Sequence, residues 1–249
     1  MSRPLVTVLT ATVGNPLLTH CIESVYDQVG DFDIQHLIFI DGPEVMGSAM
    51  RRIDTSMTPY REGYRQDIVR LPYSVGKDRW NGHRMYGAGT YLAEGDFVIY
   101  LDDDNSIKPY HIQSCLEAIE GKGWTFAFRN IQDKDEKFIC QDNCESLGIH
   151  PSVCGPDDYF IDVNCYFLRR EVAVSLSPVW FRKFREPGQL EIDRAMAQFL
   201  RANYTFQPTY KYSVNYTVGN TVNSVRREFF INGNAYMMQK YNGSLPWVK

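Results

Sequence analysis

The chain has 249 residues, of which 44% are hydrophobic and 22% are charged, and its formal net charge is −4 at pH 7. This balance is that of a folded globular protein and argues against intrinsic disorder. The acidic charge argues against a nucleic-acid partner, which usually requires a basic surface. No apolar run approaches the roughly 20 residues that a membrane-spanning helix needs, and the threonine-rich start lacks the pattern of a signal peptide. We therefore expect a cytoplasmic protein with no transmembrane segment. Any contact with a membrane would be peripheral.

Strand and helix patterns alternate through the first half of the chain. Short β-branched and apolar runs predict strands, and apolar residues at helical spacing predict helices between them. The predicted strands are residues 5–12, 34–42, 67–73 and 97–101, and the predicted helices are residues 15–28, 82–95 and 109–123. Such alternation predicts an α/β fold with a mostly parallel sheet flanked by helices, in which ligands bind beyond the carboxyl ends of the strands.

The second half has a weaker pattern. Residues 124–133 and 160–172 are predicted as strands, and residues 190–203 as an amphipathic helix. From Tyr204 onward the chain is rich in tyrosine and asparagine without strong periodicity, which suits either a sugar-binding surface or an ordinary packed one. No linker or internal repeat separates the halves, so we expect a single continuous domain.

Three consecutive aspartates follow the strand at residues 97–101, in "YLDDDN". Carboxylates this close raise one another's pKa or recruit a cation. In an extended segment Asp102 and Asp104 point the same way while Asp103 points elsewhere. Two converging carboxylates suit Mg²⁺ or Mn²⁺. The alternatives are a solvated acidic turn or a helix cap.

A second candidate metal site is the segment "CQDNCESLGIHPSVC". Cys140, Cys144, Cys154 and His150 offer four zinc ligands, but the segment lacks the C-x2-C pair that makes zinc motifs specific. We favour free or packed thiols, and without a secretion signal disulfides are the less expected use. Whether these four residues bind zinc stays open.

The motifs together resemble the inverting GT-A glycosyltransferases of glycosyltransferase family 2. "VTVLTATVGNPLLTHCIESVYDQ" is similar to the opening strand and helix of that family, and "LIFIDGPE" to its second strand, which ends in Asp-Gly. "WNGHRMYGAGTYLAEGDFVIYLDDDN" resembles the stretch that leads into the family's DXD motif. The resemblance is strong over residues 1 to about 110 and weaker to about 200. It implies one GT-A domain over residues 1–249, with a nucleotide-sugar-binding half (1–120) and an acceptor-binding half (121–249).

The resemblance also implies which residues bind the donor. The first strand would line the nucleotide pocket, Asp41 would contact the base or ribose, and Arg84 would counter phosphate charge. Strand propensity and a surface salt bridge are the structural alternatives for the threonines and for Arg84. The implied nucleotide-sugar-binding residues are Thr10, Ala11, Thr12, Asp41, Asn81, Arg84, Asp102 and Asp103.

The same resemblance implies a divalent cation, Mn²⁺ or Mg²⁺, on Asp102 and Asp104 that bridges the donor diphosphate. Some GT-A enzymes add a late histidine ligand, but the last histidine here is His150. Metal binding would therefore rest on Asp104, the diphosphate and water.

Acceptor activation needs a general base. "REPGQLEIDRAMAQFL" resembles the family's acidic motif at the start of a late helix. Asp193 is the predicted base and Glu191 the second choice, although an acid in the first turn of a helix also has a purely structural explanation. "DDYFIDVNCYFLRRE" resembles the segment beside the acceptor site, so Asp158 or Asp162 is predicted to contact acceptor hydroxyls.

The predicted function is inverting transfer of a sugar from a nucleotide sugar to a hydroxyl, in glycan or polysaccharide synthesis. UDP-sugars are favoured because uridine donors are common in the family. One alternative is a non-catalytic nucleotide- or glycan-binding module of the same fold. A sugar-phosphate nucleotidyltransferase is less favoured, because the loop "TATVGNPLL" has one glycine and no basic residue to cradle phosphates.

Overall fold

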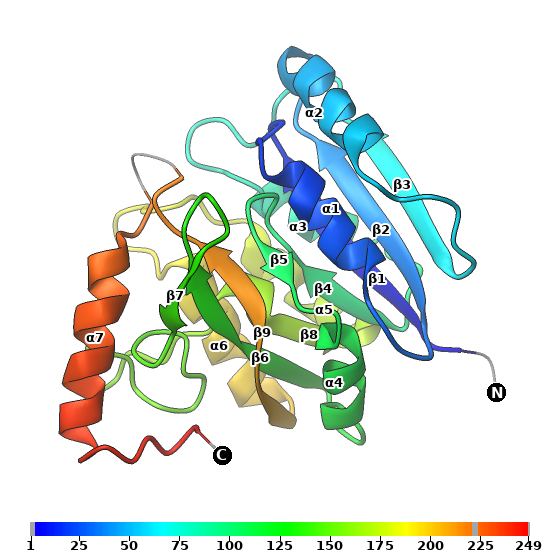
Figure 1. Ribbon diagram of the computed structural model, residues 1–249. Helices are drawn as coiled ribbons and strands as arrows, with labels where there is room; N and C mark the ends of the chain where they lie inside the picture. Colours follow the sequence, from blue (N-terminus) through cyan, green and yellow to red (C-terminus); the bar gives the residue numbers. More distant parts are fainter. Residues whose placement is uncertain (1–2, 221–223, 249) are drawn as a thin grey trace.

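The computed structural model describes residues 3–220 and 224–248. Its described residues form one nine-stranded mixed sheet with the order β3-β2-β1-β4-β8-β6-β9-β5, and β7 pairs with β6 (Figure 1). The strands are β1 Leu5–Thr12, β2 Asp33–Ile40, β3 Tyr64–Arg70, β4 Phe97–Tyr100, β5 Ser106–Ile107, β6 Trp124–Gln132, β7 Phe138–Gln141, β8 Tyr166–Arg169 and β9 Phe206–Thr217.

Seven α-helices and two short 3-10 helices connect these strands within the described residues. In Figure 1, α1 and α4 lie in front of the sheet, α5 and α6 lie behind it, and α7 stands beside β7 at its edge. The helices are α1 Leu18–Tyr26, α2 Pro43–Thr55, α3 His83–Gly89, α4 His111–Ala118, α5 Arg170–Leu176, α6 Ile192–Asn203 and α7 Arg227–Lys240, and the 3-10 helices are η1 Val163–Cys165 and η2 Ser177–Trp180.

The two halves of the sheet differ in strand direction. β3, β2, β1 and β4 are parallel neighbours, as the alternating pattern predicted. β8 is antiparallel to both β4 and β6, whereas β9 is parallel to β6 and antiparallel to β5. The continuous sheet joins the halves through the β4–β8 pair, so the carboxyl end of β4 lies at the junction.

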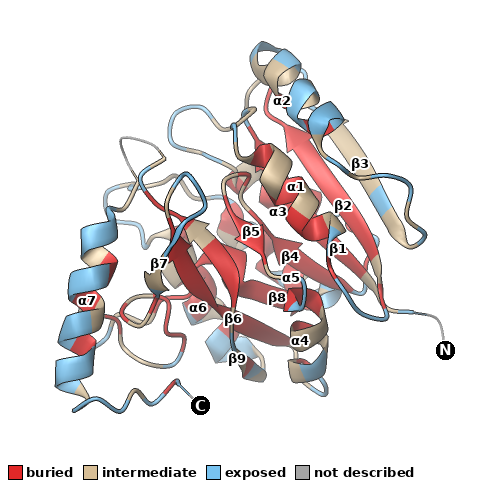
Figure 2. Ribbon diagram, viewed as in Figure 1, coloured by how far each residue is buried: buried red, intermediate tan, exposed pale blue. Residues whose placement is uncertain are grey.

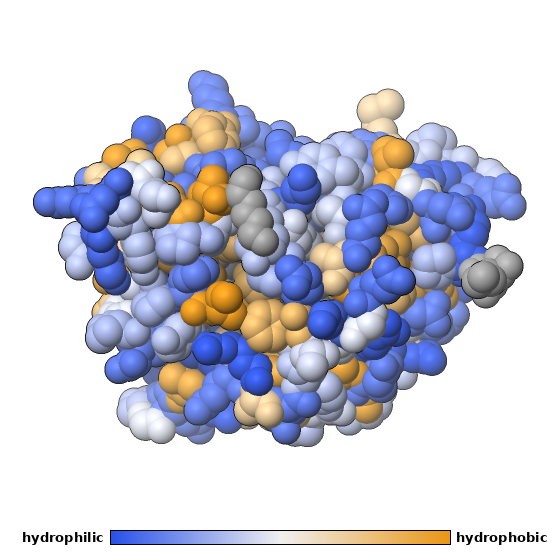
Figure 3. Space-filling model, turned by 90° about the horizontal axis from the view of Figure 1, so that it is seen from below, coloured by the Kyte–Doolittle hydropathy of each residue, from blue (hydrophilic) through white to orange (hydrophobic). Residues whose placement is uncertain are grey.

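Most residues of the central strands, including consecutive ones that point to opposite faces of the sheet, are buried (Figure 2). Three aromatic residues fix α3 and η2 against β4: the ring centroids of Tyr100 and Trp180 are 4.7 Å apart, and those of Tyr86 and Trp180 are 5.0 Å apart. The face seen from below mixes hydrophilic and hydrophobic residues (Figure 3). The packing of Tyr86 matters for the site, because its hydroxyl reaches the turn that follows β4.

Several elements differ from the sequence prediction. The predicted strand over 160–172 is wrong for most of its length: only Tyr166–Arg169 is a strand, because Asp162 caps the 3-10 turn before it and α5 starts at Arg170. The predicted helix over 82–95 ends at Gly89. The sequence analysis did not predict α2, β5, β7, α5, β9, α7 or the two 3-10 helices. No described helix has both the length and the apolar character required to span a membrane.

Candidate active site

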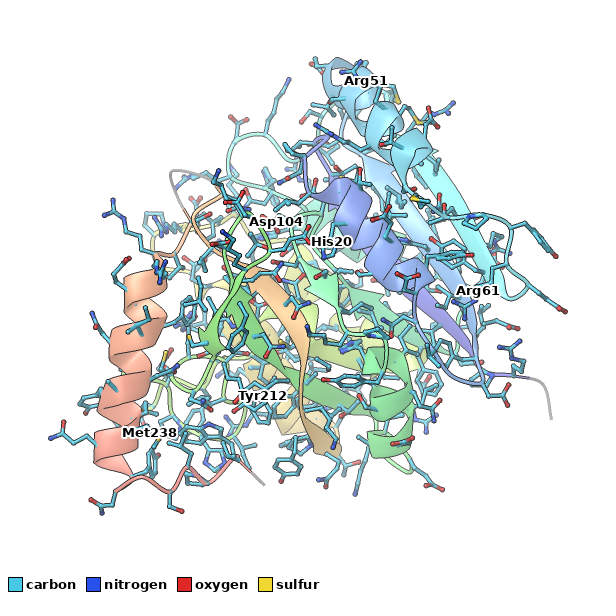
Figure 4. The ribbon with its side chains drawn as sticks, viewed as in Figure 1. His20, Arg51, Arg61, Asp104, Tyr212 and Met238 are labelled. Carbon is cyan, nitrogen blue, oxygen red and sulfur yellow. The ribbon has the colours of Figure 1, made fainter. Side chains whose placement is uncertain are left out.

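A cavity of about 530 Å³ lies beyond the carboxyl ends of β1, β2 and β4. It is the edge of the sheet at which α/β folds bind ligands, and Figure 4 shows Asp104 there, above the ends of the strands. The lining residues are Ala11, Thr12, Val13, Asp41, Glu44, Val45, Ser74, Gly76, Lys77, Asn81, Gly82, Met85, Asp102, Asp103 and Asp104.

Most of the predicted donor-site residues meet in this cavity, and two do not line it. Thr10 lies farther back on β1, where its hydroxyl is 3.0 Å from Nε2 of the buried His36. The guanidinium of Arg84 lies 3.6 Å from the centre of the Trp80 ring. The roles of Thr10 and Arg84 in donor binding stay predictions. A cationic side chain that does line the cavity is Lys77.

The three aspartates sit on a tight turn rather than on an extended strand end. The backbone N–H of Asn105 donates to the carbonyl of Asp102, 3.1 Å away, which closes a β-turn. The assumption of extended geometry was therefore wrong, because aspartate and asparagine favour turns and the strand ends at Tyr100. Each aspartate side chain takes a different set of partners.

Asp102 is held on three sides. Its Oδ1 accepts from the Tyr86 hydroxyl at 2.8 Å, its Oδ2 accepts from Nδ2 of Asn164 at 3.0 Å, and its backbone N–H donates to Oδ1 of Asn164 at 2.6 Å. Burial raises the pKa of Asp102, and the Asp162 carboxylate adds to the rise in spite of these donors. The carboxylate is thus fixed in place with a charge that the site stabilises poorly.

Asp103 and Asp104 carry still less favourable charges. Thr12 donates to Asp103 at 2.5 Å, and burial followed by the charge of Asp102 raises the pKa of Asp103 to about 6. Asn220 donates to Asp104 at 2.6 Å, and burial together with both neighbouring aspartates raises the pKa of Asp104 to about 8. In the described part of the chain, no lysine or arginine forms an ion pair with any of the three. A bound cation would offset this repulsion.

Asp41 organises the loop that forms one wall of the cavity. Its carboxylate accepts from the backbone N–H groups of Val75 (2.6 Å) and Gly76 (3.1 Å) and from the Ser74 hydroxyl (2.8 Å). A Cβ atom at Gly76 would come within 2.7 Å of Asp41 and 2.5 Å of the Asn81 carbonyl, so only glycine fits there. The loop continues to Asn81, a non-glycine residue with a φ of 48°. The contact of Asp41 with the base or ribose stays a prediction.

A second cavity of about 240 Å³ adjoins the first, and both are lined by Asn81, Gly82 and Asp102. Asp193, in the first turn of α6, faces this second cavity and accepts a hydrogen bond from the backbone N–H of Val163 at 3.2 Å. Burial raises the pKa of Asp193 well above its usual range, and the charges of Asp162 and Asp102 raise it further. The structure thus brings the predicted base next to the predicted donor site.

The other predicted catalytic and acceptor residues lie in different places. Asp162 lines the second cavity. Glu191 precedes α6, lines neither cavity and accepts from the backbone N–H of Arg185 at 3.4 Å. Asp158 lines a separate cavity of about 550 Å³, where it forms an ion pair with Arg194. These positions leave the roles of Glu191 and Asp158 as predictions.

The sequence analysis missed several residues that complete the site. Tyr86, Asn164 and Asn220 hold the aspartates, and none has a motif of its own. Lys77 and Glu44 both line the larger cavity and form an exposed ion pair with a separation of 3.1 Å. In the sequence, the only sign that Lys77 could belong to a binding site is its place directly after the glycine of "SVGKDR".

The candidate zinc ligands are not assembled. The six cysteines are free thiols, with Cys144 buried and Cys154 exposed. His150 instead packs on Trp247, with 5.2 Å between the ring centroids. Within residues 3–220 and 224–248, no three or more His, Cys, Asp or Glu side chains are grouped so as to hold a metal ion. This finding covers the turn at residues 102–104 as well.

The single mixed sheet flanked by helices is consistent with the GT-A class of fold expected from the sequence. No family model and no curated protein matches the sequence. Among solved structures, the chain is similar to S. aureus TarS 1-349 in complex with UDP, with a TM-score of 0.60 and 11% identity over 97% of this chain and 72% of that one.

It is also similar to TarS 1-349 in complex with UDP-GlcNAc, with a TM-score of 0.58 and 10% identity over 90% of this chain. For S. aureus TarS itself the TM-score is 0.56, with 12% identity over 98% of this chain. The chain spans 60% of the UDP-GlcNAc complex chain and 44% of the TarS chain. At this identity the likeness establishes the fold.

Proposed function

We propose that the chain is an inverting glycosyltransferase that moves a sugar from a nucleotide sugar, with UDP-sugars favoured, to an acceptor hydroxyl in glycan or polysaccharide synthesis. The observation that carries the proposal is the pairing of two adjoining cavities, one lined by the three aspartates and the other by Asp193. The nucleoside diphosphate would occupy the larger cavity, with its sugar at the shared boundary. The likeness in fold to a protein crystallised with UDP-GlcNAc and with UDP supports a uridine donor.

In this proposal Asp193 is the general base. The acceptor oxygen attacks the anomeric carbon on the face opposite the diphosphate, the bond to the diphosphate breaks, and the hydroxyl proton passes to the Asp193 carboxylate. The Val163 N–H orients that carboxylate. Burial and the neighbouring carboxylates raise the pKa of Asp193, so its ionised form binds a proton more tightly than an exposed aspartate would. Asp162 lines the same cavity and is the better placed of the two predicted acceptor contacts.

We further propose that Asp102 and Asp104, together with the donor diphosphate, hold Mn²⁺ or Mg²⁺. The chemistry of the donor set fits this ion, because two carboxylates plus phosphate oxygens are its usual ligands. Burial, followed by the charges of Asp102 and Asp103, raises the pKa of Asp104 to about 8, and among the described residues no lysine or arginine pairs with it. When bound, the ion would act as a Lewis acid that stabilises charge on the leaving diphosphate.

Calorimetric titration of UDP, GDP, dTDP and CDP, each with Mn²⁺ and with EDTA, tests the donor site. We expect one nucleotide to bind only with Mn²⁺, and binding to be lost in D104A. The matched control is D135A, which removes an aspartate that is 62% exposed in the turn between β6 and β7 and should leave binding unchanged. Failure of all four nucleotides to bind would overturn the proposal.

The stereochemical part needs a separate measurement. Proton NMR of the first product formed from a UDP-sugar should show the anomeric configuration opposite to that of the donor. A product with the donor's configuration would overturn the inverting mechanism. Nucleotide binding with neither transfer nor hydrolysis of any UDP-sugar would instead favour a non-catalytic module.

A further inference from the structure

The short turn η1 lies between the donor cavity and the candidate base, and its middle residue, Asn164, is fully buried. Oδ1 of Asn164 accepts from the backbone N–H of Asp102 at 2.6 Å. Nδ2 of the same amide donates to Oδ2 of Asp102 at 3.0 Å and to Oδ1 of Asp162 at 2.7 Å. A single side chain therefore holds both the main chain and the carboxylate of Asp102.

The same turn also touches the candidate base. Val163, which precedes Asn164, donates its backbone N–H to Oδ1 of Asp193 at 3.2 Å. Asp102 and Asp193 come from distant parts of the chain, the turn after β4 and the start of α6. Two consecutive residues of η1 thus contact one carboxylate on the donor side and one on the acceptor side.

The turn is anchored to the core by a charged contact. Asp162 caps η1 by accepting from the backbone N–H of Asn164 at 3.0 Å, and its other oxygen accepts from Nη1 of Arg129 at 2.5 Å. Arg129 is 1% exposed and also pairs with Asp142 and Glu145. With its anchor fixed in this way, η1 has little freedom to shift relative to the sheet.

We propose that Asn164 is a positioning residue that fixes Asp102 at a set place relative to Asp193; this inference rests on the proposed function. Asn164 lines neither cavity, so it acts through Asp102 and not by touching substrate. An amide is required because the position needs one acceptor for the Asp102 N–H and donors for two carboxylates. An aspartate has nearly the same shape and would keep the acceptor, but its carboxylate would replace the donor and face the carboxylates of Asp102 and Asp162.

The test compares N164A and N164D with a matched pair at Gln35. Gln35 is also a buried amide: its Oε1 accepts from the Thr7 hydroxyl and the Glu94 backbone N–H, and its Nε2 donates to Asp67. It lies near the amino end of β2, away from the cavity beyond the carboxyl end. Q35A and Q35E therefore remove the same kinds of bonds without touching the site.

The readouts are the Kd of UDP in the presence of Mn²⁺, the donor KM and kcat, and Tm. Loss of a residue that orients a metal ligand typically costs about 10- to 100-fold in metal affinity or activity. We expect N164A to raise the Kd and to lower kcat/KM within that range, and N164D to raise the Kd further. Q35A and Q35E should lower Tm and leave the Kd unchanged.

The order of the two Asn164 variants separates positioning from packing. If the amide only filled space, the near-isosteric N164D would be the milder change, and that result would overturn the inference. Unchanged Kd and kcat/KM in a folded N164A would overturn it as well. N164S, which changes the volume less than N164A, gives the same readouts if N164A does not fold. Absence of UDP binding by the wild-type protein would instead overturn the proposed function, and the inference with it.

Discussion

Two groups of three carboxylates differ in how their charge is balanced. Asp142, Glu145 and Asp162 surround the guanidinium of Arg129, with N–O separations of 2.8 Å to Asp142 and 2.5 Å to Asp162. The three aspartates at 102–104 form no ion pair with a lysine or arginine in the part of the chain that the structure describes. One guanidinium thus pairs with all three carboxylates of the first group, whereas no such cation pairs with the second group among the described residues.

The pKa directions follow this division only in part. Burial alone would raise the pKa of Asp142, but Arg129 and backbone N–H donors hold it below its usual range. Burial does raise the pKa of Glu145, at the edge of that group, in spite of Arg129. On the turn, burial and like charges raise the pKa of Asp104 to about 8. Among these carboxylates, only Asp142, which has both Arg129 and several backbone N–H donors, has a lowered pKa.

The largest expected effect comes from removing the cation of the first group. R129M would leave buried carboxylates unpaired, and breaking a buried ion pair costs about 3–5 kcal/mol of the free energy of unfolding. Urea unfolding measures this loss, which Mn²⁺ should not restore. R65M, at an exposed arginine that pairs with Asp67 and Glu94, is the control and should be nearly neutral. Equal stability of R129M and R65M would contradict the assignment of the first group to the fold.

The next effect is on catalysis. D193N keeps the shape of the side chain but cannot accept the proton, so we expect kcat to fall by about 10²- to 10⁴-fold. The Kd of UDP with Mn²⁺ should not change, since Asp193 lines only the second cavity. E191Q is the comparison and should retain most of the activity, because Glu191 lines neither cavity. A larger loss in E191Q than in D193N would reverse the assignment of the base.

A smaller effect is expected on stability as a function of pH. The folded pKa of Asp104, about 8, lies above its ordinary value of 3.8. Its contribution to stability is therefore complete below about pH 4 and is lost as the pH rises through 8. D104N, which stays neutral, should match wild type at pH 4 and exceed its Tm by about 3 °C or more at pH 8, since 1 kcal/mol corresponds to about 2–4 °C for a chain of this size.

Mn²⁺ provides the check on this pH prediction. It should raise the Tm of the wild-type protein at pH 8 and narrow the gap to D104N, because an ion that binds only the folded state stabilises it. D135N, at an exposed aspartate, should follow the wild-type curve at every pH. A D104N curve that runs parallel to wild type from pH 4 to 8 would show that Asp104 does not bear the repulsion.

The two halves of the sheet also differ in how well their strands can be predicted from the sequence. The prediction for β1 is confirmed over residues 5–12, because a buried parallel strand has a strong local pattern. β9 has no such pattern, since it carries buried polar residues that are paired across strands: Asn215 donates to Ser106 and Gln132 donates to Thr217. Its pairing with β6 also shifts register. Such a strand can be recognised only once its neighbours are known.

The same reasoning applies to the site. Asp102–Asp104 and Asp193 could be predicted because each lies at the end of a recognisable element. Asn220 could not, since it contacts Asp104 across 116 positions of sequence. Asn164 likewise contacts Asp102 across 62 positions. The contacts of Asn164 and Asn220 depend on the tertiary fold, whereas the aspartates follow local sequence patterns.

The smallest expected effect concerns Lys77 and Glu44, whose side chains are 65% and 60% exposed at the wall of the larger cavity. A diphosphate bound there would compete with Glu44 for the ammonium group of Lys77. K77M should therefore raise the Kd of UDP by about three- to fivefold and E44Q should lower it by about twofold, both less so at high salt, as expected for exposed charges. In the K77M background E44Q should lose its effect, because the two changes act through one contact. If E44Q tightened binding equally with and without Lys77, Glu44 would act by direct repulsion of the nucleotide, and Lys77 would have no part in balancing the charge that the turn leaves open.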